Sequence, residues 1–187
     1  MKGMYKGILM LALALAALPV IAGTTSKDEE QAWQYPLIKN AGGVVPLPKA
    51  ALQPDPLHTY KAVFNLTKDS GGKEVNSGLA HVARAVNLFA LSSVRPEHRK
   101  FAVVIHGPAT GIVMSNEAYH QRTGHDNPNI KLIHALKEAG VELYVCGQAL
   151  AEHHIADSEV NPDITLSLSA LSDLIILQQQ GYVLYPL

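Results

Sequence analysis

The sequence predicts an α/β protein built on a parallel sheet with helices on both faces. From residue 61 onward, short apolar runs rich in β-branched residues alternate with segments of helical periodicity. The apolar runs are continuous rather than alternating with polar residues, which is typical of strands buried on both faces. Strands separated by helices favour parallel connections, because each helix returns the chain to the same end of the sheet.

The first strand is expected at residues 61–67 (KAVFNLT). A helix should follow over residues 79–90, where apolar side chains recur at spacings of three and four. Residues 101–105 (FAVVI) are continuously apolar and predict the second strand. The polar stretch after this strand contains His120 and His125, which are expected to lie in a loop.

The next helix is expected to begin at Pro128, with Asn127 as its N-cap, and to end at Gly140. Periodicity and breakers define the rest of the chain in the same way. The remaining expected elements are a strand at 141–145, a helix at 148–155, a strand at 164–168, a helix at 171–180 and a strand at 182–185. The predicted sheet therefore has five strands.

Composition excludes several classes of protein. The chain is 48% hydrophobic and 17% charged, which argues against disordered and collagenous proteins. Fifteen basic and sixteen acidic residues give a formal charge of -1, so no basic excess is available to neutralise phosphates. We therefore expect small-molecule or protein partners rather than nucleic acid.

The N-terminus resembles a Sec signal peptide at residues 1–22. Lys2 and Lys6 precede an apolar run over residues 8–18, and small residues favour cleavage after Ala22. A membrane anchor is the alternative, but a span needs roughly 20 apolar residues and the sequence turns polar too early. The expected location is the periplasm of a Gram-negative bacterium, with no membrane segment in the mature form.

Residues 23–58 are expected to form an extended, proline-rich arm ahead of a single domain over residues 59–187. Five prolines and a glycine pair exclude a helix or a central strand there. Apolar side chains in the arm would let it lie on the surface of the domain or on a neighbouring subunit.

Cys146 is the single cysteine, so an internal disulfide is impossible. It lies where a predicted strand ends and a helix begins, and backbone N–H groups at such a position can stabilise a thiolate, the nucleophilic form of the side chain. Alternatively, Cys146 is buried and acts as a small, inert apolar residue.

His106 follows the second predicted strand in the same way. If the two strands are neighbours, its imidazole could accept the thiol proton or balance the thiolate charge. Hydrogen bonding to local backbone is the alternative role. A metal site formed by Cys146 with His106, His153 or His154 matches no standard zinc spacing, so we expect no metal ion.

Three segments resemble the DsrE/DsrF-like family: VVIHGP at residues 103–108, NPNIKLIHALKEAGVELYVCGQAL at 127–150 and LSALSDLIILQQQGYVLYPL at 168–187. The resemblance covers residues 61–187. It implies a three-layer α/β/α sandwich with a five-stranded, mostly parallel sheet. It also implies a homo-oligomer, either a trimer or a hexamer. In the sulfur-relay members of this family, a cysteine at a strand end carries sulfur as a persulfide, and Cys146 falls at that position.

The resemblance also suggests residues around the cysteine. His106 and Gly107 match the HG pair of an exported branch of the family, and Gly147 and Gln148 belong to its CGQ variant. We therefore predict Cys146 and His106 as catalytic residues, and Gly107, Gly147 and Gln148 as ligand-binding residues. No cofactor is expected.

Three functions remain open on sequence grounds. The first is a periplasmic sulfur carrier or sulfurtransferase, which needs a sulfane-sulfur donor and an acceptor thiol protein because the chain has no second cysteine. The second is a non-catalytic, oligomeric binding module with an inert Cys146. The third is a metal-binding protein.

Overall fold

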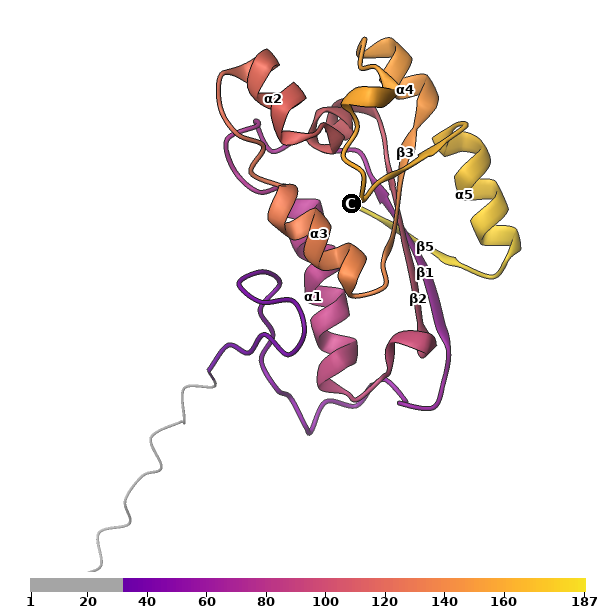
Figure 1. The fold of residues 1–187 in the computed structure, drawn as a ribbon. Helices are drawn as coiled ribbons and strands as arrows, with labels where there is room; N and C mark the ends of the chain where they lie inside the picture. Colours follow the sequence, from indigo (N-terminus) through magenta and orange to yellow (C-terminus); the bar gives the residue numbers. More distant parts are fainter. Residues whose placement is uncertain (1–31) are drawn as a thin grey trace, which may run out of the picture. The chain divides into compact units, whose positions relative to one another are not determined.

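Five strands form one sheet in the order β4-β3-β2-β1-β5 in this computed structural model, which describes residues 32–187 (Figure 1). The predicted signal peptide, residues 1–22, lies outside the described residues. The strands are β1 (Tyr60–Leu66), β2 (Arg99–Ile105), β3 (Glu142–Cys146), β4 (Thr165–Ser167) and β5 (Val183–Pro186). The helices are α1 (Ser77–Leu91), α2 (Asn116–Thr123), α3 (Ile130–Glu138), α4 (Gly147–Glu152) and α5 (Ala170–Gln179), with short 3₁₀ helices at Pro96–His98, Gly107–Val113 and Asp157–Glu159.

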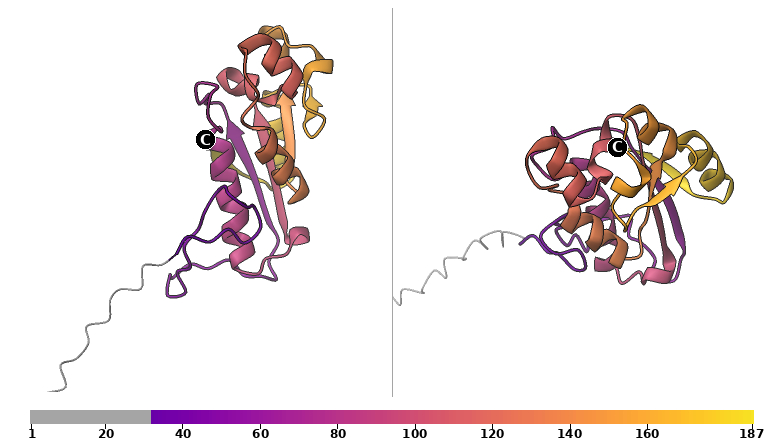
Figure 2. Two further views of the ribbon diagram at one scale, coloured as in Figure 1. Left: turned by 60° about the vertical axis from the view of Figure 1, so that its left-hand side comes forward. Right: turned by 45° about the horizontal axis from the view of Figure 1, so that its top comes forward.

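Helices cover both faces of the sheet, as the views in Figures 1 and 2 show. Buried side chains of α1, α2 and α3 pack on one face, against strand residues such as Phe64 and Val103. Ala170 and Leu177 of α5 pack on the other face, against Val104 and neighbouring small residues. These two cores confirm the predicted α/β/α sandwich.

All four strand pairings are parallel, so the carboxyl ends of the strands share one edge of the sheet. β2 and β3 are neighbours, with Ile105 opposite Val145. Cys146, the last residue of β3, pairs with Ser167 in β4. His106 follows β2 directly and Cys146 ends β3, so the two residues lie on neighbouring strands, as a role for His106 beside the cysteine requires.

The polar stretch predicted as a loop contains a helix, so the prediction for His120 was wrong. His120 lies in α2, whose first turn is capped by Ser115 Oγ accepting from the N–H of Ala118 at 3.2 Å. Gly124, with φ at 80°, ends the helix. Sequence periodicity missed α2 because only Ala118 and Tyr119 are buried along it.

The predicted start of α3 was also wrong by two residues. The helix begins at Ile130, and Asn127 closes the preceding turn by accepting from the N–H of Asn129 at 3.0 Å. The amide of Asn127 donates to the carbonyls of Ile112 and Met114 at 2.9 and 2.8 Å. The Asn127 side chain therefore holds the loop before α3 against the end of the 3₁₀ helix Gly107–Val113, and it does not cap α3.

The segment before β1 packs on α1 through a buried asparagine. Asn87 of α1 is fully buried and accepts from the N–H groups of Leu37 and Ile38 at 3.0 and 2.8 Å. Its amide donates to the carbonyls of Ile38, Ala41 and Gly42, each at 3.0 Å. No helix over residues 32–187 has the length and apolar character that crossing a membrane requires.

Candidate functional site

Cys146 lies at the carboxyl edge of the sheet, between β3 and α4. Its Sγ accepts a hydrogen bond from the N–H of Ala149 at 3.4 Å. The side chain points to the α5 side of the sheet, where it packs with Ala102, Val104 and Ala170. Cys146 is 5% exposed, so the protein rather than solvent supplies most of the surroundings of the sulfur.

Gly147 lets α4 begin directly over β4. A Cβ atom at this position would lie 2.8 Å from the carbonyl oxygen of Ser167, which is closer than side chains and backbone approach one another in folded proteins. The glycine is therefore explained by the packing that holds Cys146 in place. This role does not depend on a ligand.

Gly107 and Gln148 lie beside the two central residues of the site. Gly107 has φ at 56°, a left-handed conformation that glycine adopts without strain. Its carbonyl accepts from Thr110 Oγ1 at 2.6 Å, which stabilises the turn after β2. Gln148 is exposed, and its Nε2 donates to the carbonyl of Leu168 at 3.3 Å. Ligand binding by Gly107, Gly147 and Gln148 stays a prediction.

His106 is held by a side chain from the neighbouring strand. Its Nε2 lies 2.7 Å from Asn65 Oδ1 in β1. An amide oxygen only accepts, so Nε2 donates and carries the proton in this arrangement. Burial lowers the pKa of His106 below its ordinary value, which favours the neutral ring. Nδ1 of the neutral ring then has a free lone pair and can accept a proton.

The sheet register places His106 and Cys146 together. His106 is the residue after Ile105, and Cys146 is the residue after Val145, its partner in the sheet. Side chains alternate along a strand, so His106 and Cys146 share the α5 side at the same level of neighbouring strands. Within residues 32–187, each side chain has its own hydrogen-bond partner, and no hydrogen bond joins the two.

A family model described as the DsrE/DsrF-like family matches residues 61–186, which is more than half of the chain. The chain belongs to the DsrE/DsrF-like family. This confirms the resemblance seen in the sequence, and it relates the protein to sulfur-relay proteins in general. A comparison with curated proteins finds no match.

Among solved structures, this DsrE/DsrF-like chain is similar to MTH1491, a protein of unknown function from Methanobacterium thermoautotrophicum. The two chains are 15% identical and superpose with a TM-score of 0.52. The match covers 68% of this chain and 99% of the other. At this identity the similarity concerns the fold alone.

The sequence analysis of this DsrE/DsrF-like domain did not identify three polar residues that lie at the same edge of the sheet. They are Asn65 in β1, Ser167 at the end of β4 and Asp173 on α5. Ser167 Oγ lies 2.9 Å from the carbonyl oxygen of Val145 and forms a hydrogen bond with the Asp173 carboxylate. Polar residues near the ends of otherwise apolar strands were the available signal for Asn65 and Ser167.

Two of the histidines weighed as metal ligands, His153 and His154, do not join the site. His153 and His154 follow the last residue of α4, at the opposite end of that helix from Cys146, and both are exposed. Across the described part of the chain, no three His, Cys, Asp or Glu side chains are grouped to hold a metal ion. Cys146 and His106, supported by Asn65, therefore form the candidate site.

Proposed function

We propose that the protein is a periplasmic sulfur carrier that holds a persulfide on Cys146. The main support is the position of Cys146: it is the sole cysteine and it ends a central strand beside His106. Membership of a family related to sulfur-relay proteins adds to this support.

The loading step transfers one sulfur atom. The Cys146 thiolate attacks the sulfane sulfur of thiosulfate, the S–S bond to the sulfonate sulfur breaks, and sulfite leaves with the bonding electron pair. A Cys146 persulfide anion is formed. With polysulfide as donor, the leaving group is a polysulfide shorter by one sulfur. An acceptor protein then attacks the outer sulfur with its own thiolate, and the Cys146 thiolate is released.

His106 is the residue that prepares the thiolate in this proposal. The thiol proton passes to Nδ1 of the neutral imidazole, and the imidazolium remains beside the negative sulfur. Asn65 keeps Nε2 protonated and thereby leaves Nδ1 as the basic nitrogen. Asn65 acts through His106 and is a positioning residue.

A second function, a binding module with an inert cysteine, is favoured by the burial of Cys146, which is 5% exposed. The reaction of the folded protein with iodoacetamide distinguishes the two functions. A carrier has a thiol that alkylates in the native state, because sulfur must enter and leave. A binding module has a thiol that alkylates only after unfolding.

The proposal is tested by intact-protein mass spectrometry after incubation with thiosulfate or polysulfide. Wild type should gain about 32 Da in a form that dithiothreitol removes, and Cys146→Ser should gain nothing. His106→Gln should load more slowly than wild type. Failure of the reduced wild-type protein to gain sulfur from either donor would reject the carrier.

We also propose that the protein is exported and forms a homo-oligomer. Export is supported by the sequence of residues 1–22, and N-terminal sequencing of protein from the periplasmic fraction should begin at Gly23. Oligomer formation is supported by exposed apolar side chains on and around α5. These are Leu168, Leu171, Ile175 and Ile176.

A further inference from the structure

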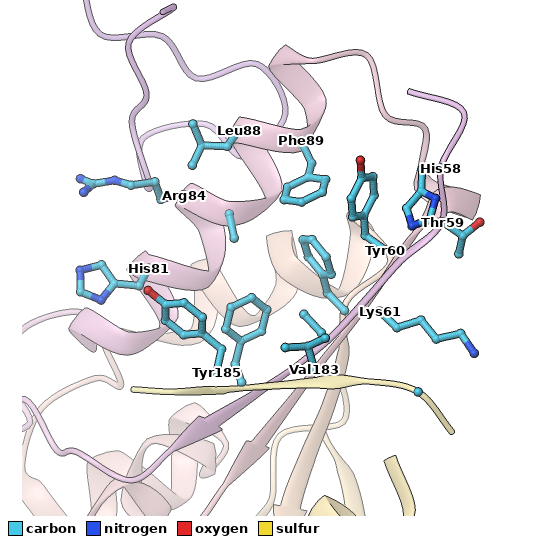
Figure 3. Close-up of a pocket in the computed structure, with 15 residues that line it drawn as sticks. His58, Thr59, Tyr60, Lys61, His81, Arg84, Leu88, Phe89, Val183 and Tyr185 are labelled. Carbon is cyan, nitrogen blue, oxygen red and sulfur yellow. The ribbon is translucent and has the colours of Figure 1, made fainter. Parts of the chain in front are cut away.

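A cavity of about 760 Å³ lies on the side of the sheet opposite Cys146. It opens between α1 and the edge formed by β1 and β5, as Figure 3 shows. Neither Cys146 nor His106 lines it. Its volume falls in the range of small-molecule sites, roughly 300–1,000 Å³. The sulfur carrier proposed above makes no use of this cavity.

A continuous series of aromatic rings lines the cavity, and we call it the aromatic ladder. Each ring packs on the next at an angle, and the centroid distances are 4.8 to 5.7 Å. Phe64 and Phe101 are nearly buried, whereas Tyr185, at the end of the series, is 56% exposed. The members in order are His58, Tyr60, Phe89, Phe101, Phe64 and Tyr185.

The rim of the cavity is cationic. Lys61 of β1 and Arg84 of α1 lie at opposite sides of it (Figure 3), and no aspartate or glutamate is among the lining residues. Lys61 Nζ donates to the carbonyl of Gln180 at 2.9 Å, and Arg84 Nε donates to the carbonyl of Gly43 at 3.2 Å. These acceptors are neutral, and no described carboxylate forms an ion pair with either side chain. Neither side chain is paired with a carboxylate within residues 32–187. The Lys61 ammonium nevertheless lies at the C-terminal end of α5, over the Tyr182 ring on the α5 side of the sheet, whereas the Arg84 guanidinium lies over the Trp33 ring. Arg84 is therefore the cation on the α1 side, where the cavity lies.

A second, smaller hollow adjoins the cavity. His81 and Tyr185 line it and also line a second hollow of about 250 Å³. Lys68 adds another cation there.

We propose that this cavity binds an amphipathic organic anion. Its apolar body lies on the aromatic ladder, and its acid group is held at the rim by Arg84. Burial of the apolar body supplies most of the affinity, and Arg84, which no described carboxylate neutralises, selects for negative charge. A second copy of this chain fits less well, because a two-fold contact through this face would bring the same cations together.

Two fluorescent probes that differ by one charge test the proposal. They are 8-anilinonaphthalene-1-sulfonate and N-phenyl-1-naphthylamine, which has the same rings without the sulfonate. Wild type should bind the sulfonate probe roughly tenfold more tightly than the neutral probe. Arg84→Gln should reduce this preference to about twofold or less while the neutral probe keeps its affinity.

Two further variants locate the bound probe. Ala85→Phe places a ring in the cavity from α1 and should abolish binding of both probes, with an unchanged circular dichroism spectrum. Ile175→Ser removes an exposed apolar side chain from α5 and should leave binding unchanged.

Three results would overturn the proposal. Equal affinity of wild type for the two probes would reject the selection for an anion. Undiminished binding to a folded Ala85→Phe variant would place the probes elsewhere. A change of oligomeric state in Ala85→Phe would identify the face as a contact between subunits. Sulfur loading of Cys146 is measured separately, so failure here does not affect the proposed carrier.

Discussion

At the scale of single residues, the surroundings of a histidine shift its pKa, and the pKa values of two histidines here shift in opposite directions. Burial lowers the pKa of His106. A hydrogen bond that His134 Nδ1 donates to Asp163 Oδ2, 2.9 Å away, raises the pKa of His134. The two side chains therefore make opposite contributions to the pH dependence of stability.

His106→Gln should lose less stability in acid than wild type does. As the pH falls through about 6.5, the unfolded chain takes up the proton at position 106 before the folded protein does, so the free energy of unfolding decreases until the pH is below the folded-state pKa. Glutamine does not titrate, so the variant lacks this loss of stability in acid. Urea unfolding between about pH 7.5 and about pH 5 measures the difference.

His134→Gln is the matched control with the opposite sign. In wild type, His134 stabilises the folded protein below the ordinary histidine pKa, and this stabilisation is lost as the pH rises through the raised, folded-state pKa. The variant should therefore lose more stability in acid than wild type does. Identical pH profiles for His106→Gln and wild type would contradict the neutral, buried His106.

Gly147→Ala should destabilise the protein by about 1–3 kcal/mol, because the added Cβ meets the Ser167 carbonyl oxygen at 2.8 Å. Gly111→Ala is the control, since its added Cβ would find nothing closer than Met114 Cε at 3.9 Å. Chemical denaturation of both variants measures the change. If the two variants lose the same stability, close packing of α4 on β4 does not explain Gly147.

At the scale of elements, one side chain anchors a segment that has almost no secondary structure of its own. Residues 34 and 44 form an isolated antiparallel bridge, and Asn87 makes the hydrogen bonds that an absent sheet partner would otherwise make. Ile38 and Val44 are buried in the resulting packing. The segment before β1 therefore packs on α1 and belongs to the folded domain.

Asn87→Ala should lower the free energy of unfolding by about 2–4 kcal/mol, because buried backbone groups of residues 37–42 lose their partners. Hydrogen exchange should increase at the amides of Leu37 and Ile38 while β1 and β2 stay protected. Gln53→Ala, an exposed change in the same segment, should cost less than about 1 kcal/mol. Unchanged exchange at Leu37 in Asn87→Ala would show that other contacts hold the segment.

At the scale of the whole molecule, the two faces of the sheet are covered unequally. α1, α2 and α3 cover one face, whereas α5 provides most of the cover on the other and exposes apolar side chains to its surroundings (Figure 1). Ile175 is 57% exposed and Leu171 is 78% exposed. Such a surface favours contact with another protein chain.

Ile175→Lys should shift the proposed homo-oligomer toward the monomer, because the contact would bury an unpaired charge. Leu52→Lys, an equally apolar and more exposed site on the proline-rich segment, should leave the assembly unchanged. Sedimentation velocity of both variants and wild type measures the mass. A monomeric wild type at a concentration of about 100 μM would contradict the oligomer.

The sequence by itself determined the fold class and the central cysteine of the candidate site. Continuous apolar runs and helical periodicity depend on nearby residues, so they identified the five strands and most of the helices. They failed for α2, whose stability comes from caps at Ser115 and Gly124 and not from an apolar stripe.

Only the tertiary structure decided which residues surround Cys146. The contact of His106 with Asn65 requires β1 beside β2, and the common level of His106 and Cys146 requires β2 beside β3. The cavity under α1 likewise combines aromatic residues that are distant in the sequence, such as Tyr60 and Tyr185. Strand order is set by the packing of the entire chain, and no local pattern of side chains encodes it.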